Sequence, residues 1–141
     1  MFDAASEKTL PTPESQTSKG GKTILVVDDE ESVLKVTKAM LERLGYKVKD
    51  FLSAEKALEF IKEARDQVDL VLTDVIMPVM NGVELMNEIR KIIENMKVIL
   101  MSGNIFDVEI PAGEICLSKP FSTAKLIKCV RGALHGGQSE C

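Results

Sequence analysis

Five short apolar runs alternate along the chain with longer amphipathic stretches, and this alternation restricts the possible folds more than any other feature of the sequence. Strands that are apolar on both sides need cover on both faces of their sheet. Helical connections between parallel strands supply this cover, because each crossover passes over one face. The pattern therefore predicts an α/β domain with a doubly wound, five-stranded parallel sheet. The strands are expected at residues 23–27, 48–51, 70–73, 97–101 and 115–118.

Four amphipathic stretches between and after these strands predict helices. The first is expected to end before Gly45, since a glycine after the last turn commonly ends a helix. Ser53 and Ser122 precede the second and the last helix as N-caps. The third follows Gly82, for which we expect a turn with positive φ. The predicted inner faces comprise Val33, Val36, Met40, Leu41 and Leu44; Ala54, Ala57, Leu58 and Ile61; Leu85, Met86, Ile89, Ile92 and Ile93; and Leu126 or Ile127, Val130 and Leu134.

One folded domain is expected, with a segment of different character on each side. A chain of 141 residues has room for one domain of ordinary size. Residues 1–21 are rich in Pro, Ser, Thr and Gly and show almost no apolar periodicity, which predicts a disordered tail or linker. The folded domain is expected at residues 22–134, followed by a flexible C-terminal tail at residues 135–141.

The charge balance argues against nucleic acid as a direct partner. Lys and Arg number 18 and Asp and Glu number 22, a net charge of −4, so no excess of positive charge is available to neutralise phosphates. No run approaches the ~18 consecutive apolar residues of a membrane span. Asp3 and Glu7 stand where a secretory signal would be basic and then apolar. These features predict a cytoplasmic protein without a membrane partner.

Polar side chains stand directly after four of the predicted strands. Asp28 and Asp29 follow the first strand, Asp74 the third, Ser102 the fourth and Lys119 the fifth. In a doubly wound fold the carboxyl ends of the strands share one edge of the sheet, where ligands bind. We therefore expect these five side chains to converge in one site.

Three carboxylates in one site need a compensating charge. Two like charges ~4 Å apart repel by about 1 kcal/mol in water and about 4 kcal/mol at an effective dielectric constant of 20. Either a cation binds or one acid keeps a proton. Ligands that are all oxygen favour a hard cation, which predicts Mg²⁺, with Mn²⁺ as a substitute. A lysine and a hydroxyl beside that cation suit a phosphoryl group, and Asp74, alone on its strand, is the candidate nucleophile.

Four motifs, in this order, resemble those of the receiver domains of response regulators in two-component signalling. They are ILVVDDE at residues 24–30, LTDVIMPVMNG at 72–82, ILMSG at 99–103 and LSKPF at 117–121. The resemblance covers about residues 22–134 and implies the flavodoxin-like strand order 2-1-3-4-5. The chain resembles a receiver that is either free-standing or part of a hybrid histidine kinase.

The resemblance implies a phosphoprotein of a phosphorelay, a signalling domain rather than an enzyme with its own substrate. Asp74 would accept the phosphoryl group from a phosphohistidine of a histidine kinase or a histidine phosphotransfer domain. The domain would catalyse its own phosphorylation and its slow dephosphorylation. Lys119 would pair with the phosphate, and Ser102 would move toward it, changing the conformation of the following loop. A monomer is expected, with a cis peptide bond between Lys119 and Pro120.

The resemblance also implies a set of Mg²⁺ ligands. Asp29 and Asp74 would bind the ion directly, and Asp28 would bind it through a water molecule. The main-chain carbonyl of Ile76 would be a further ligand.

Two features depart from the pattern of this family. Cys116 stands three residues before Lys119, where receivers generally have a Tyr or Phe that turns inward on activation. Lys119 follows Ser102 by only 17 residues, which leaves too little chain for a full helix and the return to the sheet. We expect the fourth helix of the receiver fold to be shortened or missing.

Two other functions are compatible with parts of the sequence. A pseudo-receiver, which binds proteins without being phosphorylated, is favoured by Cys116 and the short connection, but the intact acids, Ser102 and Lys119 argue against it. A Mg²⁺-dependent phosphohydrolase of the haloacid dehalogenase type also uses an Asp nucleophile and a lysine. That class has Asp-x-Asp after its first strand, whereas Asp28 and Asp29 are adjacent.

Overall fold

The computed structural model describes residues 22–103 and 110–134, so both predicted tails, residues 1–21 and 135–141, lie outside the described residues. The described residues form one parallel sheet in the order β4-β3-β5-β6-β7, which is the predicted order 2-1-3-4-5. The strands are β3 (Thr23–Val27), β4 (Lys47–Phe51), β5 (Leu70–Asp74), β6 (Val98–Ser102) and β7 (Ile115–Ser118). The helices are α1 (Glu31–Arg43), α2 (Ala54–Glu63), the short 3₁₀ helix η2 (Arg65–Gln67), α3 (Gly82–Ile92) and α4 (Thr123–Leu134).

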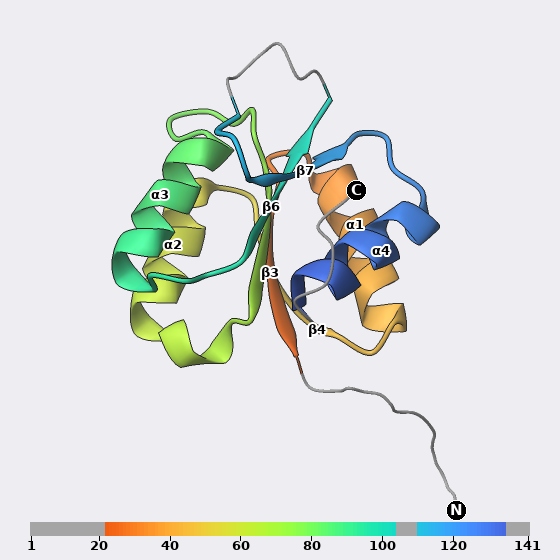
Figure 1. Cartoon of the computed structure of the whole chain (residues 1–141), viewed down its shortest axis with the longest axis horizontal. Helices are drawn as coiled ribbons and strands as arrows, with labels where there is room; N and C mark the ends of the chain where they lie inside the picture. The colour runs from red at the N-terminus through yellow and green to blue at the C-terminus, as the bar shows by residue number, and fades with distance from the viewer. Residues whose placement is uncertain (1–21, 104–109, 135–141) are drawn as a thin grey trace, which may run out of the picture.

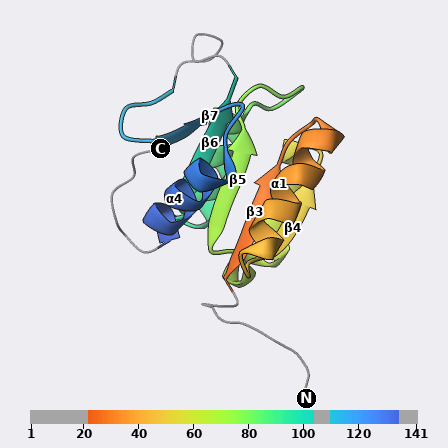
Figure 2. The ribbon, with the colours of Figure 1, turned by 90° about the vertical axis from the view of Figure 1, so that its right-hand side faces the viewer.

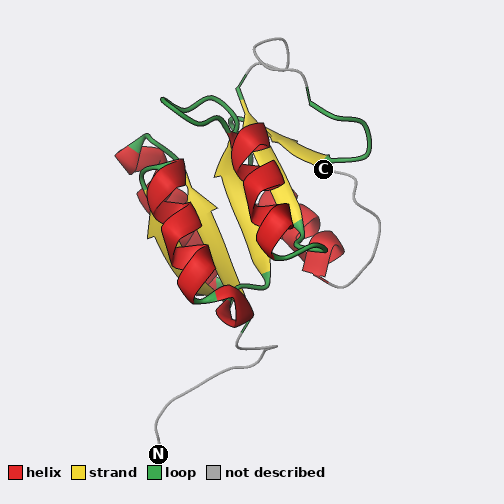
Figure 3. Ribbon diagram, turned by 90° about the vertical axis from the view of Figure 1, so that its left-hand side faces the viewer, coloured by secondary structure: helices red, strands yellow, loops and turns green. Residues whose placement is uncertain are grey.

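The sheet is a middle layer between two pairs of helices (Figure 1). Helices α1 and α4 cover the face seen in Figure 2, and α2 and α3 cover the face seen in Figure 3. Strands β3, β5 and β6 are buried along their whole length, as cover on both faces requires. Their alternating side chains fill two apolar cores: Val71 and Leu100 pack with α2 and α3, and Leu72 and Ile99 pack with α1 and α4.

Helix α1 presents a different face to the core from the predicted one. Leu34, Thr37 and Leu41 are buried, whereas Val36 is 54% exposed. Successive residues of a helix are rotated by about 100°, so Val36 lies off the face on which Thr37 is buried. The placement of Val36 on the inner face was therefore wrong, because a polar threonine belongs to the buried stripe. Gly45, with φ +98°, follows the C-cap of this helix, as predicted.

Side-chain hydrogen bonds cap the first turns of several helices. The hydroxyl of Ser53 accepts the N–H of Lys56 at 3.2 Å, and that of Ser122 accepts the N–H of Lys125 at 3.1 Å, which confirms both predicted caps. Asn81 is the N-cap of α3, which the sequence reading did not predict. None of the helices in the described ranges combines the length and the apolar composition that crossing a bilayer requires.

Four α-helices accompany the five strands in the described part of the chain. The connection between β6 and β7 is described at residues 103 and 110–114, and these residues contain no helix. This agrees with a shortened or missing fourth helix. Residues 104–109 lie outside the described residues. The guanidinium of Arg90 in α3 donates to the carboxylate of Glu114 at 2.7 Å, so this ion pair holds the end of the connection against α3.

Candidate functional site

The predicted polar residues meet at the carboxyl edge of the sheet. Asp28 and Asp29 follow β3, Asp74 ends β5, Ser102 ends β6 and Lys119 follows β7. Parallel pairing of these strands brings their ends together. The main-chain oxygen of Ser102 accepts the N–H of Lys119 at 2.9 Å, which holds the start of the lysine loop at the end of β6.

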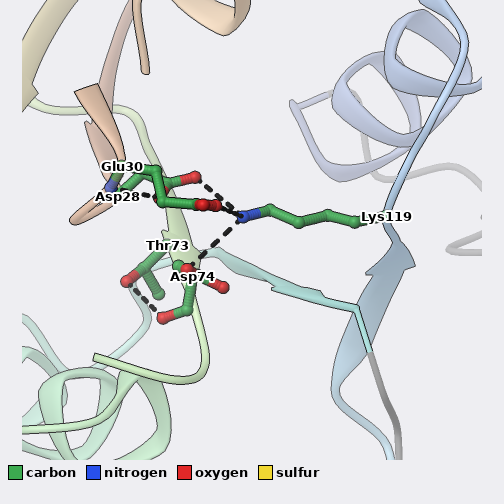
Figure 4. Close-up of polar contacts among 5 residues, drawn as sticks. All are labelled: Asp28, Glu30, Thr73, Asp74 and Lys119. Carbon is green, nitrogen blue, oxygen red and sulfur yellow. Dashed lines mark hydrogen bonds and ion pairs between the residues drawn. The ribbon is translucent and has the colours of Figure 1, made fainter. Parts of the chain in front are cut away.

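The side chain of Lys119 extends toward three carboxylates (Figure 4). Its Nζ donates to Oδ2 of Asp28 at 2.9 Å and lies 3.4 Å from Oδ2 of Asp74. The side chains of Asp28 and Asp74 are 1% and 9% exposed, so the lysine compensates two charges that water hardly reaches. Glu30, at 3.9 Å, is 65% exposed and contributes little. Burial by itself would lower the pKa of Lys119, but the hydrogen bond to Asp28 and the charges of Asp74 and Asp28 raise it overall.

Three carboxylates are close enough together to hold a cation. Asp28, Asp29 and Asp74 each offer one oxygen, and these oxygens lie within 4.8 Å of one another. Ligands on opposite sides of a Mg²⁺ ion are about 4.2 Å apart, since each bond is about 2.1 Å long. Small side-chain movements would therefore close the three oxygens around such an ion. The donor set, which is all oxygen, also fits a hard cation.

The ionisation of Asp74 without a cation is less favourable than that of an exposed aspartate. Its pKa is raised from 3.8 to about 6, mainly because burial penalises the charged form. The charges of Asp28 and Asp29 raise this pKa further, whereas the charge and hydrogen bond of Lys119 lower it. The metal-free site thus carries a proton more readily than an exposed aspartate does.

This raised pKa predicts a pH-dependent stability difference between the wild type and Asp74→Asn. The unfolded aspartate ionises near pH 4 and the folded one near pH 6, so the ionised form of Asp74 destabilises the fold as the pH rises through this window. One pKa unit corresponds to about 1.36 kcal/mol, and residual solvent exposure reduces the effect, so we expect Asp74→Asn to gain about 1–3 kcal/mol relative to the wild type between pH 4 and pH 7.

Urea unfolding in metal-free buffer at a series of pH values measures this difference. The exposed Asp66, in η2, provides the control Asp66→Asn, for which no such gain is expected. A stability difference between the wild type and Asp74→Asn that stays constant from pH 4 to pH 7 would contradict the unfavourable ionisation of Asp74.

Two further predicted features have clear positions. Ile76 follows Asp74 by two residues and is 44% exposed. The peptide bond between Lys119 and Pro120 is cis, as expected.

Gly82 has a different role from the predicted one. The glycines with positive φ in the described residues are Gly45 and Gly113, so the expected turn with positive φ at Gly82 was wrong. Gly82 is instead the first residue of α3, and a Cβ at this position would collide with the main-chain oxygen of Asp74. The glycine is needed because α3 begins directly against the backbone of the candidate nucleophile.

One polar contact within the site was not predicted from the sequence. The hydroxyl of Thr73 is buried and donates to the main-chain oxygen of Asp74 at 3.0 Å (Figure 4). A threonine in a strand is ordinarily explained by β propensity, so no local pattern distinguishes this one.

An apolar groove of about 570 Å³ opens beside the acidic cluster. It lies between α1 and the loop that joins β7 to α4, and Lys119 belongs both to its wall and to the ion-pair network. The sequence did not predict this groove, because Val33, Val36 and Met40 of its lining are apolar residues expected in the core. The lining residues are Ser32, Val33, Val36, Thr37, Met40, Gly103, Lys119, Pro120 and Phe121.

Comparison with known families and proteins gives consistent matches. The family model of the response regulator receiver domain matches residues 24–131. The sensor kinase CckA of Brucella abortus is 35% identical over 137 residues, which are 94% of this chain and 14% of that protein. A CpxR homologue of Haemophilus influenzae, a transcriptional regulatory protein, is 31% identical over 121 residues, which are 82% of this chain and 52% of that protein. The chain thus spans at most about half the length of these two relatives.

Two solved structures share the fold over nearly their whole length. A response regulator receiver domain protein from Clostridium thermocellum superposes with a TM-score of 0.76 and 32% identity, covering 82% of this chain and 95% of that one. The receiver domain of the hybrid histidine kinase CckA has a TM-score of 0.70 and 31% identity, covering 79% of this chain and 98% of that one.

Proposed function

The chain belongs to the response regulator receiver family of two-component signalling, and from this premise we propose that it takes a phosphoryl group from a phosphohistidine onto Asp74 in a Mg²⁺-dependent reaction. One observation carries the proposal: the carboxylates of Asp28, Asp29 and Asp74 cluster at the end of the sheet with the ammonium of Lys119 beside them. Carboxylates beside a candidate nucleophile, together with a partly buried ammonium group, suit phosphoryl transfer.

The transfer exchanges one bond at phosphorus for another. A carboxylate oxygen of Asp74 attacks the phosphorus atom, and the new O–P bond makes an acyl phosphate. The P–N bond of the phosphohistidine breaks, and its electron pair stays on the imidazole, which takes up a proton from water. Asp74 must be ionised to attack, and even its metal-free pKa of about 6 leaves it mostly ionised at neutral pH.

The residues around Asp74 would hold the cations that offset the negative charge of the transferred group. Asp29, Asp74 and the carbonyl of Ile76 would hold Mg²⁺ directly, and Asp28 through a water molecule. When bound, Mg²⁺ would offset the charge of the phosphoryl oxygens. Lys119, now paired with Asp28 and Asp74, would turn its ammonium group to a phosphoryl oxygen.

The apolar groove beside the site is the proposed docking place of the phosphodonor. Its partner would be a helix of a histidine kinase or histidine phosphotransfer domain that carries the phosphohistidine. Val36, 54% exposed on α1, offers this helix an apolar contact. Because Lys119 lines the groove as well as the acidic cluster, a helix in the groove would have its histidine close to Asp74.

Phosphorylation would be signalled through the end of β6. The hydroxyl of Ser102 would bond to a phosphoryl oxygen and draw the following loop toward the site. Cys116 lies opposite Leu100 in β6, and burial raises the pKa of its thiol. This half-buried thiol is much smaller than an aromatic ring, so we propose that the switch operates without an aromatic side chain at this position. We further propose that the domain is a cytoplasmic monomer without direct nucleic-acid contacts.

Intact-mass spectrometry tests the proposed function. The wild type and Asp74→Asn are incubated with acetyl phosphate, with Mg²⁺ and with EDTA in its place. We expect one phosphoryl adduct in the wild type with Mg²⁺, no adduct with EDTA, and none in Asp74→Asn. If the wild type binds Mg²⁺ and still forms no adduct, a pseudo-receiver that binds proteins without phosphorylation becomes the better description.

A further inference from the structure

The hydroxyl of Thr73 has one hydrogen-bond acceptor, the main-chain oxygen of Asp74, at 3.0 Å (Figure 4). Thr73 is 0% exposed, and its side chain points to the same face of β5 as that of Val71, in the apolar core against α2 and α3. Valine has the same shape and suits such a core better than threonine does. A buried hydroxyl is costly unless it is hydrogen-bonded, so this bond accounts for the threonine.

The oxygen that Thr73 contacts belongs to the last peptide of β5. Pairing between β5 and β6 ends at Asp74, opposite Met101, and the N–H of Val75, on the other side of this peptide, donates to the main-chain oxygen of Met101 at 2.8 Å. Gly82 packs against the same oxygen so closely that a Cβ would collide with it. The N–H of Gly82 also donates to the main-chain oxygen of Val75 at 2.8 Å. β6 therefore holds the N–H side of the peptide between Asp74 and Val75, whereas its oxygen is held by the hydroxyl of Thr73 and by the close packing of α3.

The orientation of this peptide affects the reactive groups on both sides of it. A rotation of the peptide turns the backbone of Asp74 and with it the direction of the carboxylate toward Lys119. The same rotation moves the chain that follows, including the carbonyl of Ile76. Both groups belong to the site assigned above, so an error in one torsion angle would displace the nucleophile and the carbonyl together.

We propose that Thr73 is a positioning residue for the phosphoacceptor: its hydroxyl fixes the Asp74 peptide, so that the carboxylate stays directed into the acidic cluster. This inference rests on the proposed function, because it assigns Thr73 a role in the reaction of that site. Thr73 is fully buried, out of reach of a donor, and acts through the backbone of Asp74.

Removal of the hydroxyl tests the role. Thr73→Val keeps the shape of the side chain and is expected to lower the rate of Mg²⁺-dependent phosphorylation at saturating acetyl phosphate by about tenfold, less than the ~100-fold that a displacement of about 1 Å costs. The KM for acetyl phosphate is expected to stay the same, since the donor does not contact Thr73. Thr73→Ser retains the hydroxyl and is expected to react at nearly the wild-type rate.

A second readout does not depend on the reaction. Calorimetric titration with Mg²⁺ is expected to give a Kd about tenfold higher for Thr73→Val than for the wild type. Loss of a group that orients metal ligands typically weakens metal binding by about 10–100-fold, and we expect the lower end of this range. Thr23→Val is the matched control, because Thr23 is also buried in a strand but lies at the opposite end of the sheet. This control is expected to leave both the rate and the Kd unchanged.

The outcomes separate this inference from the proposed function. If Thr73→Val matches the wild type in rate and in Mg²⁺ affinity, or if Thr73→Ser is as impaired as Thr73→Val, the positioning role is wrong. If the wild type forms no adduct, the proposed function fails, and the Mg²⁺ titration alone still decides the role of Thr73. Should Thr73→Val fail to fold, the pair Thr73→Ser and Thr73→Ala makes the same comparison, since these two differ only in the hydroxyl.

Discussion

Replacing Gly82 with alanine is expected to lower the free energy of unfolding by about 3 kcal/mol, at the upper end of the usual cost of overpacking a core. The added Cβ would collide with the main-chain oxygen of Asp74 and lie 3.0 Å from both its carbonyl carbon and the Cα of Val75. All of these are backbone atoms, so no side-chain rotation relieves the contact. Either the start of α3 or the end of β5 must move, although alanine is otherwise favoured over glycine in a helix by about 1 kcal/mol.

Urea unfolding of Gly82→Ala measures this effect. Gly103→Ala is the matched control for stability, because a Cβ at Gly103 would have no atom within 4 Å and its φ is not positive. Since the movement displaces Asp74, we also expect Gly82→Ala to be phosphorylated by acetyl phosphate at least about tenfold more slowly than the wild type. Equal stability of the two alanine variants would show that α3 and β5 are not in close contact at this position.

Replacing Lys119 with methionine is expected to destabilise the metal-free protein by about 3 kcal/mol. The substitution removes the ammonium group 2.9 Å from Asp28, whose side chain is 1% exposed, and leaves a buried carboxylate without its counter-charge. Breaking a buried ion pair costs about 3–5 kcal/mol, and the 16% exposure of the Lys119 side chain places our expectation at the lower end. Mg²⁺ is expected to reduce the loss, because a bound cation compensates the same carboxylates.

A double-mutant cycle separates the lost pair from the lost side chain. Asp28→Asn removes the buried charge, so we expect Lys119→Met to cost at least about 1 kcal/mol less in the Asp28→Asn background than in the wild type. Lys91→Met is the control, since Lys91 pairs with Glu88 at 3.0 Å while its own side chain is 70% exposed. Exposed pairs are worth about 0–1 kcal/mol. If Lys91→Met and Lys119→Met lower the free energy of unfolding equally, burial of the ion pair between Lys119 and Asp28 adds nothing to stability.

The fold was predictable from the sequence because its strands are short, apolar and separated by amphipathic stretches. All five strands lie within one residue of the predicted bounds, and Gly45, Ser53 and Ser122 end or cap the helices as expected. The predicted inner face was wrong in part where a helix buries a polar residue and exposes an apolar one. In α1 a threonine is buried and Val36 is exposed, and only the packing of the helix against the sheet decides between them.

By itself, the sequence determined that Asp28, Asp29, Asp74 and Lys119 lie together, because parallel strands put their carboxyl ends at one edge and these residues end or follow the strands. The tertiary structure alone decided how these side chains are held and charged. The contact of Gly82 with the Asp74 backbone, the hydrogen bond from Thr73 and the raised pKa of Asp74 all result from the packing of α3 and the neighbouring strands around one peptide. Such effects depend on distances of a few ångströms and on exclusion of water, which the order of residues along the chain does not specify.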